Sequence, residues 1–311
     1  MIQIVSKAFF TALAGSTSLK SLASRYGMRG PRSFARRFIA GETIDEATAA
    51  ARIVEASGLQ QTLDLLGESV ASMAEADTAT RVYLEVLDTI VASGVGRNVS
   101  LKLTQLGLTI DRATCVDNLR RILDAAQRHD FFVRIDMENS PFTQVTLDVF
   151  ETMWQQGYRN VGVVLQSCLP RSEADAHRMN ELGARVRIVK GAYQEPRAVA
   201  YQDKAQVDAA FVEITKLLLS GGTYPAIATH DPAMIAAARA HASQHGITPD
   251  KFEFQMLYGI RRDLQGELSA EGFNVRVYIP FGREWFPYFM RRLAERPANI
   301  GFVVRAIASE R

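Results

Sequence analysis

Seven polar side chains stand at equivalent places along this sequence, each within the last residues of a short apolar run. Together they supply amine, carboxylate, imidazole, amide and phenol groups, which bind charged ligands and move protons. Burying such groups without partners is costly, so their recurrence at run ends favours a functional site over chance. The seven residues are Lys102, Asp136, Gln166, Lys190, His230, Gln255 and Tyr278.

A second group of reactive side chains lies in the segment 276–299. We expect a helix there that begins near Glu284 and stops before Pro297. Two adjacent guanidinium groups on one helical face match the geometry of a carboxylate, and aromatic neighbours would close a pocket around them. The alternative is a solvated basic helix with a surface Arg–Glu pair. The residues of that face are Tyr288, Arg291, Arg292 and Glu295, and the flanking aromatic residues are Trp285 and Phe289.

Other site chemistries find no support in the sequence. No HExxH or CxxC pattern is present, so we expect no metal site. Walker A, GxGxxG and GxSxG patterns are also absent, which excludes a P-loop, a Rossmann fingerprint and a serine nucleophile on an elbow.

Apolar runs alternate with helical patterns, which favours parallel strands joined by helices. Eight such units predict an α/β fold, a TIM-type (β/α)8 barrel, in which the run ends meet at one mouth. An open, doubly wound sheet is the alternative. We expect helices such as Asp117–Arg128 and Val207–Leu219 between the runs. The runs are Thr62–Leu66, Val99–Leu103, Phe131–Met137, Val161–Gln166, Val186–Lys190, Ala226–His230, Phe252–Leu257 and Val275–Ile279.

The composition excludes several classes of protein. Hydrophobic residues make up 47% and charged residues 23% of the 311 residues, unlike a disordered chain. Two cysteines, Cys115 and Cys168, are too few for a disulfide scaffold. No uninterrupted apolar run reaches the roughly 18 residues that a spanning helix needs.

The net charge of +2 is unevenly distributed, because seven Lys and Arg and no acidic residue precede Glu42. We expect an N-terminal basic helical arm over residues 1–58, with a helix capped by Thr43, and a catalytic barrel over residues 59–311. If the arm only docks on the barrel or targets the protein, deletion of residues 1–40 should leave the activity largely intact. A cleaved transit peptide and attachment to an anionic membrane surface are the alternatives.

Eight motifs then point to one enzyme family. They cover roughly residues 40–305 in the order in which that family carries them. The chain resembles the proline dehydrogenase family, flavin enzymes whose fold is a (β/α)8 barrel that binds FAD non-covalently. The motifs are TLDLLGE (62–68), SLKLTQLG (100–107), RIDMEN (134–139), VLQSCL (164–169), RIVKGAY (187–193), IATHD (227–231), EFQMLYGIR (253–261) and the ending R-x-Y-x-P-x-G-x-x-W-x-x-Y-x-x-R-R-x-x-E-R-P-A-N (276–299).

The resemblance implies roles for seventeen residues by their positions in these motifs. Asp136 and Arg187 are implied as catalytic, with Arg187 beside the reactive flavin nitrogen, where its charge would stabilise the reduced ring. Gly191 fits a close backbone approach to the cofactor. The implied carboxylate clamp is Arg291, Arg292 and Lys102. The implied residues around the substrate ring are Asp136, Tyr193, Leu257, Tyr278 and Tyr288. The implied FAD contacts are Met137, Gln166, Arg187, Lys190, Gly191, Ala192, Thr229, His230 and Gln255.

The implied reaction is oxidation of L-proline to Δ1-pyrroline-5-carboxylate, with electrons passing from the reduced flavin to a membrane quinone. Tyr278 favours proline over 4-hydroxyproline. The resemblance further implies a cytoplasmic enzyme with peripheral contact at the inner face of the membrane and no nucleic-acid partner. Because no aldehyde dehydrogenase region precedes Arg311, a separate pyrroline-5-carboxylate dehydrogenase would act downstream.

Two other functions remain compatible with the residues. Lys102 and Lys190 at strand ends could form a Schiff base in an aldolase or lyase. The basic segment Arg25–Arg37 could belong to a membrane or nucleic-acid adaptor.

Overall fold

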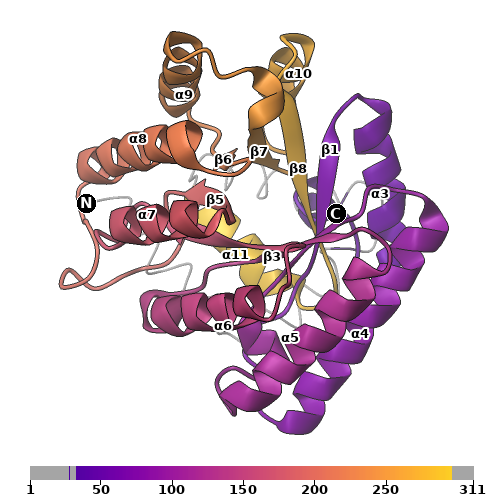
Figure 1. The fold of residues 1–311 in the computed structure, drawn as a ribbon. Coiled ribbons are helices and arrows are strands. Elements are labelled where there is room, and N and C mark those ends of the chain that lie inside the picture. The colour runs from indigo at the N-terminus through magenta and orange to yellow at the C-terminus, as the bar shows by residue number, and fades with distance from the viewer. Residues whose placement is uncertain (1–27, 29–32, 296–311) are drawn as a thin grey trace.

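Eight parallel strands close into a barrel in which each strand pairs with the next and β8 pairs with β1 (Figure 1). The structure is a computed structural model, and it describes residue 28 and residues 33–295. The (β/α)8 barrel is confirmed, and the open sheet is wrong. The strands are β1 Gln60–Leu65, β2 Asn98–Leu101, β3 Phe132–Ile135, β4 Val161–Gln166, β5 Arg185–Val189, β6 Ala226–Ala228, β7 Glu253–Leu257 and β8 Asn274–Phe281.

Helices alternate with the strands and surround the barrel (Figure 1). Four short 3-10 helices accompany them in the described part of the chain. The helices are α3 Ile44–Ala56, α4 Met73–Ser93, α5 Arg112–Gln127, α6 Thr143–Gln155, α7 Ser172–Leu182, α8 Lys204–Gly221, α9 Pro232–Gln244, α10 Arg262–Ala270 and α11 Trp285–Glu295. The 3-10 helices are η1 Phe34–Arg37, η2 Leu103–Leu106, η3 Ser140–Phe142 and η4 Pro249–Lys251.

Side-chain caps decide where several helices begin. The predicted capping box of Thr43 and Glu46 is present at the start of α3. α5 and α8 begin earlier than predicted, because Asp111 and Asp203 accept backbone N–H groups at their first turns. Asp231 caps α9 in the same way, and β6 therefore ends at Ala228, two residues before the predicted strand end.

The strands alternate between apolar and polar residues, and this alternation divides the barrel into two environments. Leu63 of β1 and Val99 of β2 belong to the hydrophobic core under the surrounding helices. The polar residues that alternate with these apolar ones contact one another across the strands instead. Asp64 of β1 and Lys102, directly after β2, are an example. The interior of the barrel is consequently polar, with charged side chains that pair between different strands.

The helix after β8 has an unusual position that matters for the site. α11 places Tyr288, Arg291 and Arg292 on the same cavity as the strand ends, so it lies over the C-terminal mouth. α3 instead packs against β8 and β1, where a helix following β8 would otherwise complete the outer ring. The division of the chain at residue 58 stays a prediction, and α3 is the part of the expected arm that docks on the barrel.

The segment just before α3 supports α11. The Phe38 ring lies 6.2 Å from the Phe289 ring, and Ala40 N–H donates to the Pro280 carbonyl at 2.9 Å. Residues 1–27 of the expected basic helical arm lie outside the described residues. Deletion of residues 1–40, harmless if the arm only docks, would remove part of the support of α11.

A pair of glycine substitutions tests the contact between this segment and the barrel. A Cβ added to Gly259 would lie 1.7 Å from the Arg37 carbonyl oxygen, and Gly259 has a φ of +74°. We expect Gly259→Ala to lower the free energy of unfolding by at least about 1–3 kcal/mol. Gly266 in α10 has no atom within 4 Å of its added Cβ, and Gly266→Ala should be stabilising by about 0.5–1 kcal/mol. Urea unfolding of both variants checks this, and equal effects would contradict the contact.

Candidate active site

A cavity of about 620 Å³ lies at the C-terminal mouth of the barrel, under α11. All seventeen residues for which the resemblance implies a substrate or cofactor role line this one cavity, although they come from seven strand ends and a helix. The seven polar run ends therefore do converge. Further lining residues that the sequence did not single out are Val164, Val189, Lys204, Ala228, Asp231, Pro232, Met256 and Arg261.

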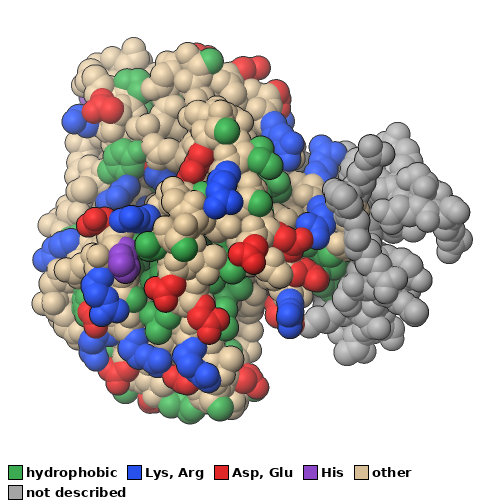
Figure 2. Space-filling view, turned by 90° about the vertical axis from the view of Figure 1, so that its right-hand side faces the viewer, with side chains coloured by type: hydrophobic (Ala, Val, Ile, Leu, Met, Phe, Trp, Pro, Cys, Tyr) green, Lys and Arg blue, Asp and Glu red, His purple; other side chains and the backbone are tan. Residues whose placement is uncertain are grey.

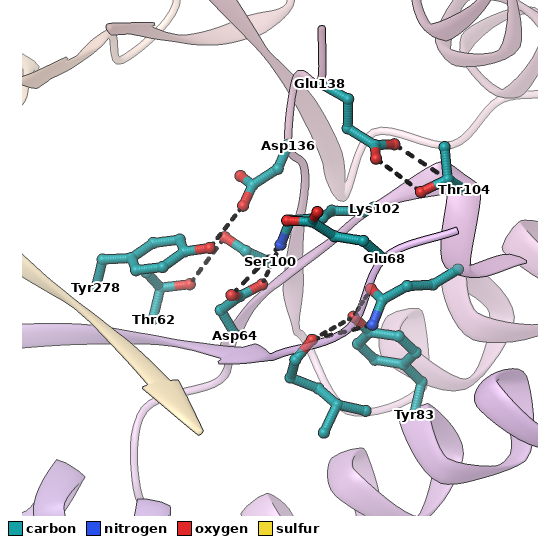
Figure 3. A network of polar contacts seen from close by, with 12 residues as sticks. Thr62, Asp64, Glu68, Tyr83, Ser100, Lys102, Thr104, Asp136, Glu138 and Tyr278 are labelled. Carbon is teal, nitrogen blue, oxygen red and sulfur yellow. Dashed lines mark hydrogen bonds and ion pairs between the residues drawn. The ribbon is translucent and has the colours of Figure 1, made fainter. Parts of the chain in front are cut away.

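A buried ion pair between Arg187 and Asp136 forms one part of the cavity wall. Arg187 Nη1 donates to Asp136 Oδ1 at 2.7 Å. The Tyr278 hydroxyl donates to the other oxygen, Asp136 Oδ2, at 2.7 Å (Figure 3). Arg187 Nη2 also donates to Ser100 Oγ at 3.2 Å. Burial, with the charge of Asp136, raises the pKa of Tyr278 well above its usual value, so its hydroxyl stays a donor. These contacts fix the guanidinium on the cavity before any ligand binds.

A second buried ion pair holds Lys102. Its Nζ lies 3.3 Å from Asp64 Oδ1, and both side chains are almost completely buried, at 8% and 0% exposure (Figure 3). Burial alone would lower the pKa of Lys102, but the charges of Asp64 and Asp136 outweigh it and raise the pKa. Lys102 therefore faces the cavity as a cation.

The two arginines of α11 meet different partners. Arg291 forms an ion pair with Glu68 in the loop after β1, and the Arg292 guanidinium lies over the Tyr288 ring at 5.3 Å from its centroid. The side chain of Glu295, the surface partner considered from sequence, lies outside the described residues. Burial and the charge of Glu68 raise the pKa of the nearby Tyr193 to about 12. Both arginines face the cavity, so the solvated basic helix is wrong.

The prediction that three aromatic residues close a pocket around the arginines is correct for Tyr288 only. Trp285 and Phe289 do not line the cavity but pack in a second hydrophobic cluster with Phe38 and Ile39. Trp285 Nε1 donates to Glu42 Oε1 at 3.2 Å. The reason is helical periodicity, which places Trp285 and Phe289 one turn apart on the face that meets the arm.

Lys190 is engaged by two carboxylates at the cavity rim. Its Nζ lies 2.5 Å from Asp208 Oδ1 and 2.8 Å from Asp231 Oδ2. These contacts tie the end of β5 to α8 and to the start of α9. As at Lys102, carboxylates from other elements surround the amine.

The backbone conformation and packing around Gly191 also require glycine at this position, which the sequence did not show. Its φ is +109°, and an added Cβ would lie 2.4 Å from Cys168 Sγ. The position therefore needs glycine for the local backbone and for the contact with Cys168, besides lining the cavity.

The cavity suits a large ligand with a flat ring and anionic groups, as FAD is. Its volume is within the roughly 300–1,000 Å³ of small-molecule sites. Met137, Val164 and Met256 supply apolar wall. Arg187 Nε is buried without a hydrogen-bond partner among the described residues, which leaves a donor for a bound group. The residues present therefore fit the cofactor that the resemblance implies.

Sequence reasoning missed several residues of this site. Asp64 holds Lys102, and Glu138 accepts from the Thr104 hydroxyl at 2.6 Å (Figure 3). Glu68 holds Arg291, and Ser100 holds Arg187. The signal for Asp64 and Ser100 was the alternation of polar and apolar residues within the runs, since each stands two residues from another polar position. The loop residue Glu68 carried no such pattern.

Within the described ranges, residue 28 and residues 33–295, no three His, Cys, Asp or Glu side chains gather into a metal site. None of the helices in that part of the chain is long and apolar enough to cross a membrane.

Comparisons with known proteins agree on one family. The sequence matches the family described as Proline dehydrogenase over residues 47–305. Proline dehydrogenase 1 of Bacillus subtilis (strain 168) is 41% identical over 298 residues, which cover 96% of this chain and 97% of the relative. Proline dehydrogenase of Deinococcus radiodurans is 42% identical over 279 residues, which cover 88% of this chain and 90% of the relative.

Solved structures of a longer protein share the fold. Proline utilization A (PutA) from Bdellovibrio bacteriovorus, inactivated by N-propargylglycine, matches with a TM-score of 0.80 and 28% identity over 84% of this chain. Proline utilization A with proline bound in remote sites matches with a TM-score of 0.74 and 26% identity over 88% of this chain. The chain spans 32% of the length of each of these proteins.

The Arg187–Asp136 pair can be tested by a double-mutant cycle. Asp136→Asn or Arg187→Met alone leaves an uncompensated buried charge and should lower the free energy of unfolding by about 3–5 kcal/mol. The double variant should lose clearly less than the sum. For the exposed pair of Arg178 and Glu151, Arg178→Met should cost less than about 1 kcal/mol. Urea unfolding measures all four, and additive losses at Asp136 and Arg187 would show that the pair is not coupled.

Proposed function

The chain belongs to the proline dehydrogenase family and is an enzyme that oxidises proline, and we propose the chemistry of its site from that premise. It uses non-covalently bound FAD, converts L-proline to Δ1-pyrroline-5-carboxylate and passes the electrons on to a quinone. The observation that carries this proposal is the convergence of four cations, Lys102, Arg187, Arg291 and Arg292, on one cavity at the barrel mouth. An amino-acid carboxylate and a reduced, anionic flavin are both stabilised by positive charge beside them.

Lys102, Arg291 and Arg292 would bind the carboxylate of the substrate. A lysine and two guanidinium groups give several charge-assisted hydrogen bonds from different directions, which fixes orientation as well as position. Holding the reactant in one orientation lowers the barrier by removing rotational and translational freedom beforehand. Tyr193, Leu257, Tyr278 and Tyr288 would surround the ring.

The residues that would hold the cofactor line the rest of the cavity. When bound, FAD supplies the acceptor for the hydride of the substrate. Arg187 would put its charge beside the reduced ring and stabilise it. Asp136 would contribute by lining the site and holding Arg187 and Tyr278 in place. The proposed cofactor contacts are Met137, Gln166, Arg187, Lys190, Gly191, Ala192, Thr229, His230 and Gln255.

The proposed partners and location follow from the family resemblance. They are a membrane quinone as electron acceptor, peripheral contact with the inner face of the membrane in the cytoplasm, and a separate pyrroline-5-carboxylate dehydrogenase. No described surface is assigned to any of them.

The Schiff-base alternative requires a neutral amine, and the structure gives reasons against one. The charges of Asp64 and Asp136 raise the pKa of Lys102 and so favour its charged form. Lys190 is engaged by Asp208 and Asp231 at 2.5 and 2.8 Å, which leaves its amine in two ion pairs. A protonated amine has no lone pair with which to attack a carbonyl group.

The adaptor alternative also lacks structural support in the described part of the arm. Arg36 forms an ion pair with Glu46 at 2.5 Å, and Arg37 lies over the Phe38 ring. On the face shown in Figure 2, basic and acidic side chains are interspersed over the described atoms. A nucleic-acid surface would instead gather basic residues.

The absorbance spectrum of the purified protein tests the proposed function. We expect flavin bands that L-proline bleaches in the absence of oxygen. Cyclopentanecarboxylate, which has the ring and carboxylate but no amine, should bind without bleaching. A colourless protein that borohydride traps on its substrate would instead support the aldolase or lyase.

Arg291→Lys tests the carboxylate clamp. The change replaces a planar fork by a point charge, so we expect the KM for proline to rise about 10- to 100-fold, the loss of one or two charged hydrogen bonds. FAD affinity should stay nearly unchanged. Arg283→Lys, at an exposed position before the same helix, is the control and should leave KM unaltered. An unchanged KM in Arg291→Lys would remove Arg291 from the clamp.

A further inference from the structure

Asp64 is a buried carboxylate beside the site, and the proposed function gives this residue no role. It is fully buried on β1 and does not line the cavity. Its two oxygens lie 3.3 and 3.5 Å from Nζ of Lys102, which does line the cavity (Figure 3). Among the described residues, Asp64 is the one carboxylate within 4.0 Å of that amine.

The buried amine needs such a partner to stay charged. Removing an ammonium group from water favours its neutral form, and a neutral amine attracts a carboxylate far less. The titratable groups whose charges act on Lys102 are Asp64 on β1, Asp136 directly after β3, Tyr83 on α4 and Tyr193 after β5. Glu138, after β3, is a further charge that interacts with Lys102.

The other groups cannot take the place of Asp64. Both oxygens of Asp136 are engaged, by Arg187 and by Tyr278. Tyr83 is neutral, because burial raises its pKa, and its hydroxyl donates to Gln105 Oε1. Glu138 is held by the Thr104 hydroxyl and backbone N–H. Asp64 is therefore the direct counter-charge of Lys102.

We propose that Asp64 is a positioning residue that keeps Lys102 charged at the cavity, and that it thereby sets the upper pH limit of carboxylate binding. The inference rests on the proposed function, in which Lys102 binds the substrate carboxylate. Lys102 is a cation below its own pKa, so binding is lost as the pH rises through that value. Without Asp64, the desolvation of the amine dominates, and the pKa of Lys102 falls into the pH range in which binding is measured.

The test uses the flavin-loaded protein and cyclopentanecarboxylate, whose charge is constant between about pH 6 and 10 because a carboxylic acid titrates well below that range. Its Kd is measured from the perturbation of the flavin spectrum at each pH. The variants are Asp64→Asn, Lys102→Arg and the two combined. Arginine stays protonated throughout, so the combined variant keeps a cation that does not depend on Asp64.

The wild type and Lys102→Arg should bind with little pH dependence. In Asp64→Asn, Kd should rise about tenfold for each pH unit above the lowered pKa of Lys102. The combined variant should lose this rise. Parallel profiles of wild type and Asp64→Asn, even at weaker affinity, would show a merely structural role and overturn the proposal, as would a rise that persists in the combined variant.

Asp64→Glu guards against a variant that fails to fold. It keeps the negative charge, and we expect it to retain the flat wild-type profile, whereas a pH-dependent rise in Asp64→Glu would overturn the proposal. The pH profile of kcat/KM for L-proline should show the same difference between Asp64→Asn and the wild type. If L-proline does not bleach the flavin of the wild type, the proposed function itself is refuted. If the enzyme is active but the pH profiles of Kd for wild type and Asp64→Asn are parallel, only the role of Asp64 is refuted.

Discussion

A charge inside a protein is tolerated when an opposite charge lies beside it, and the interior of this barrel is organised around that constraint. Arg187 meets Asp136, Lys102 meets Asp64, and Arg276 meets Glu253 at 2.9 Å, each pair on different strands. The polar residues of the strands thus hold fixed charges inside the barrel, while the alternating apolar residues pack against the surrounding helices. Because Arg187 and Lys102 are held before a ligand arrives, little reorganisation is needed when charge develops in the cavity.

The position of α11 follows from the same fold. With α3 occupying the outer place between β8 and β1, α11 lies over the mouth and closes the site with one face. Its other face is covered by residues 33–41. The part of the cavity wall that α11 supplies therefore depends on packing between two segments from opposite ends of the chain.

Much of the fold and site could be predicted from the sequence, because strand alternation and motif order are local signals. Lys102, Asp136 and Tyr278 were found from their places at run ends. Asp64 was not, since a carboxylate within a run gives no sign of which cation it will meet. The prediction that Trp285 and Phe289 close the pocket was wrong for a related reason. Helical spacing shows which residues share a face but not what covers that face.

The central claim is that the barrel mouth binds a carboxylate between Lys102 and the two arginines of α11. A crystal structure of the FAD-loaded protein with cyclopentanecarboxylate tests it most directly. The account predicts carboxylate oxygens within about 2.7–3.2 Å of Lys102 Nζ and of the guanidinium nitrogens of Arg291 and Arg292. A carboxylate bound elsewhere in the cavity, with these three cations paired only to protein carboxylates, would contradict it.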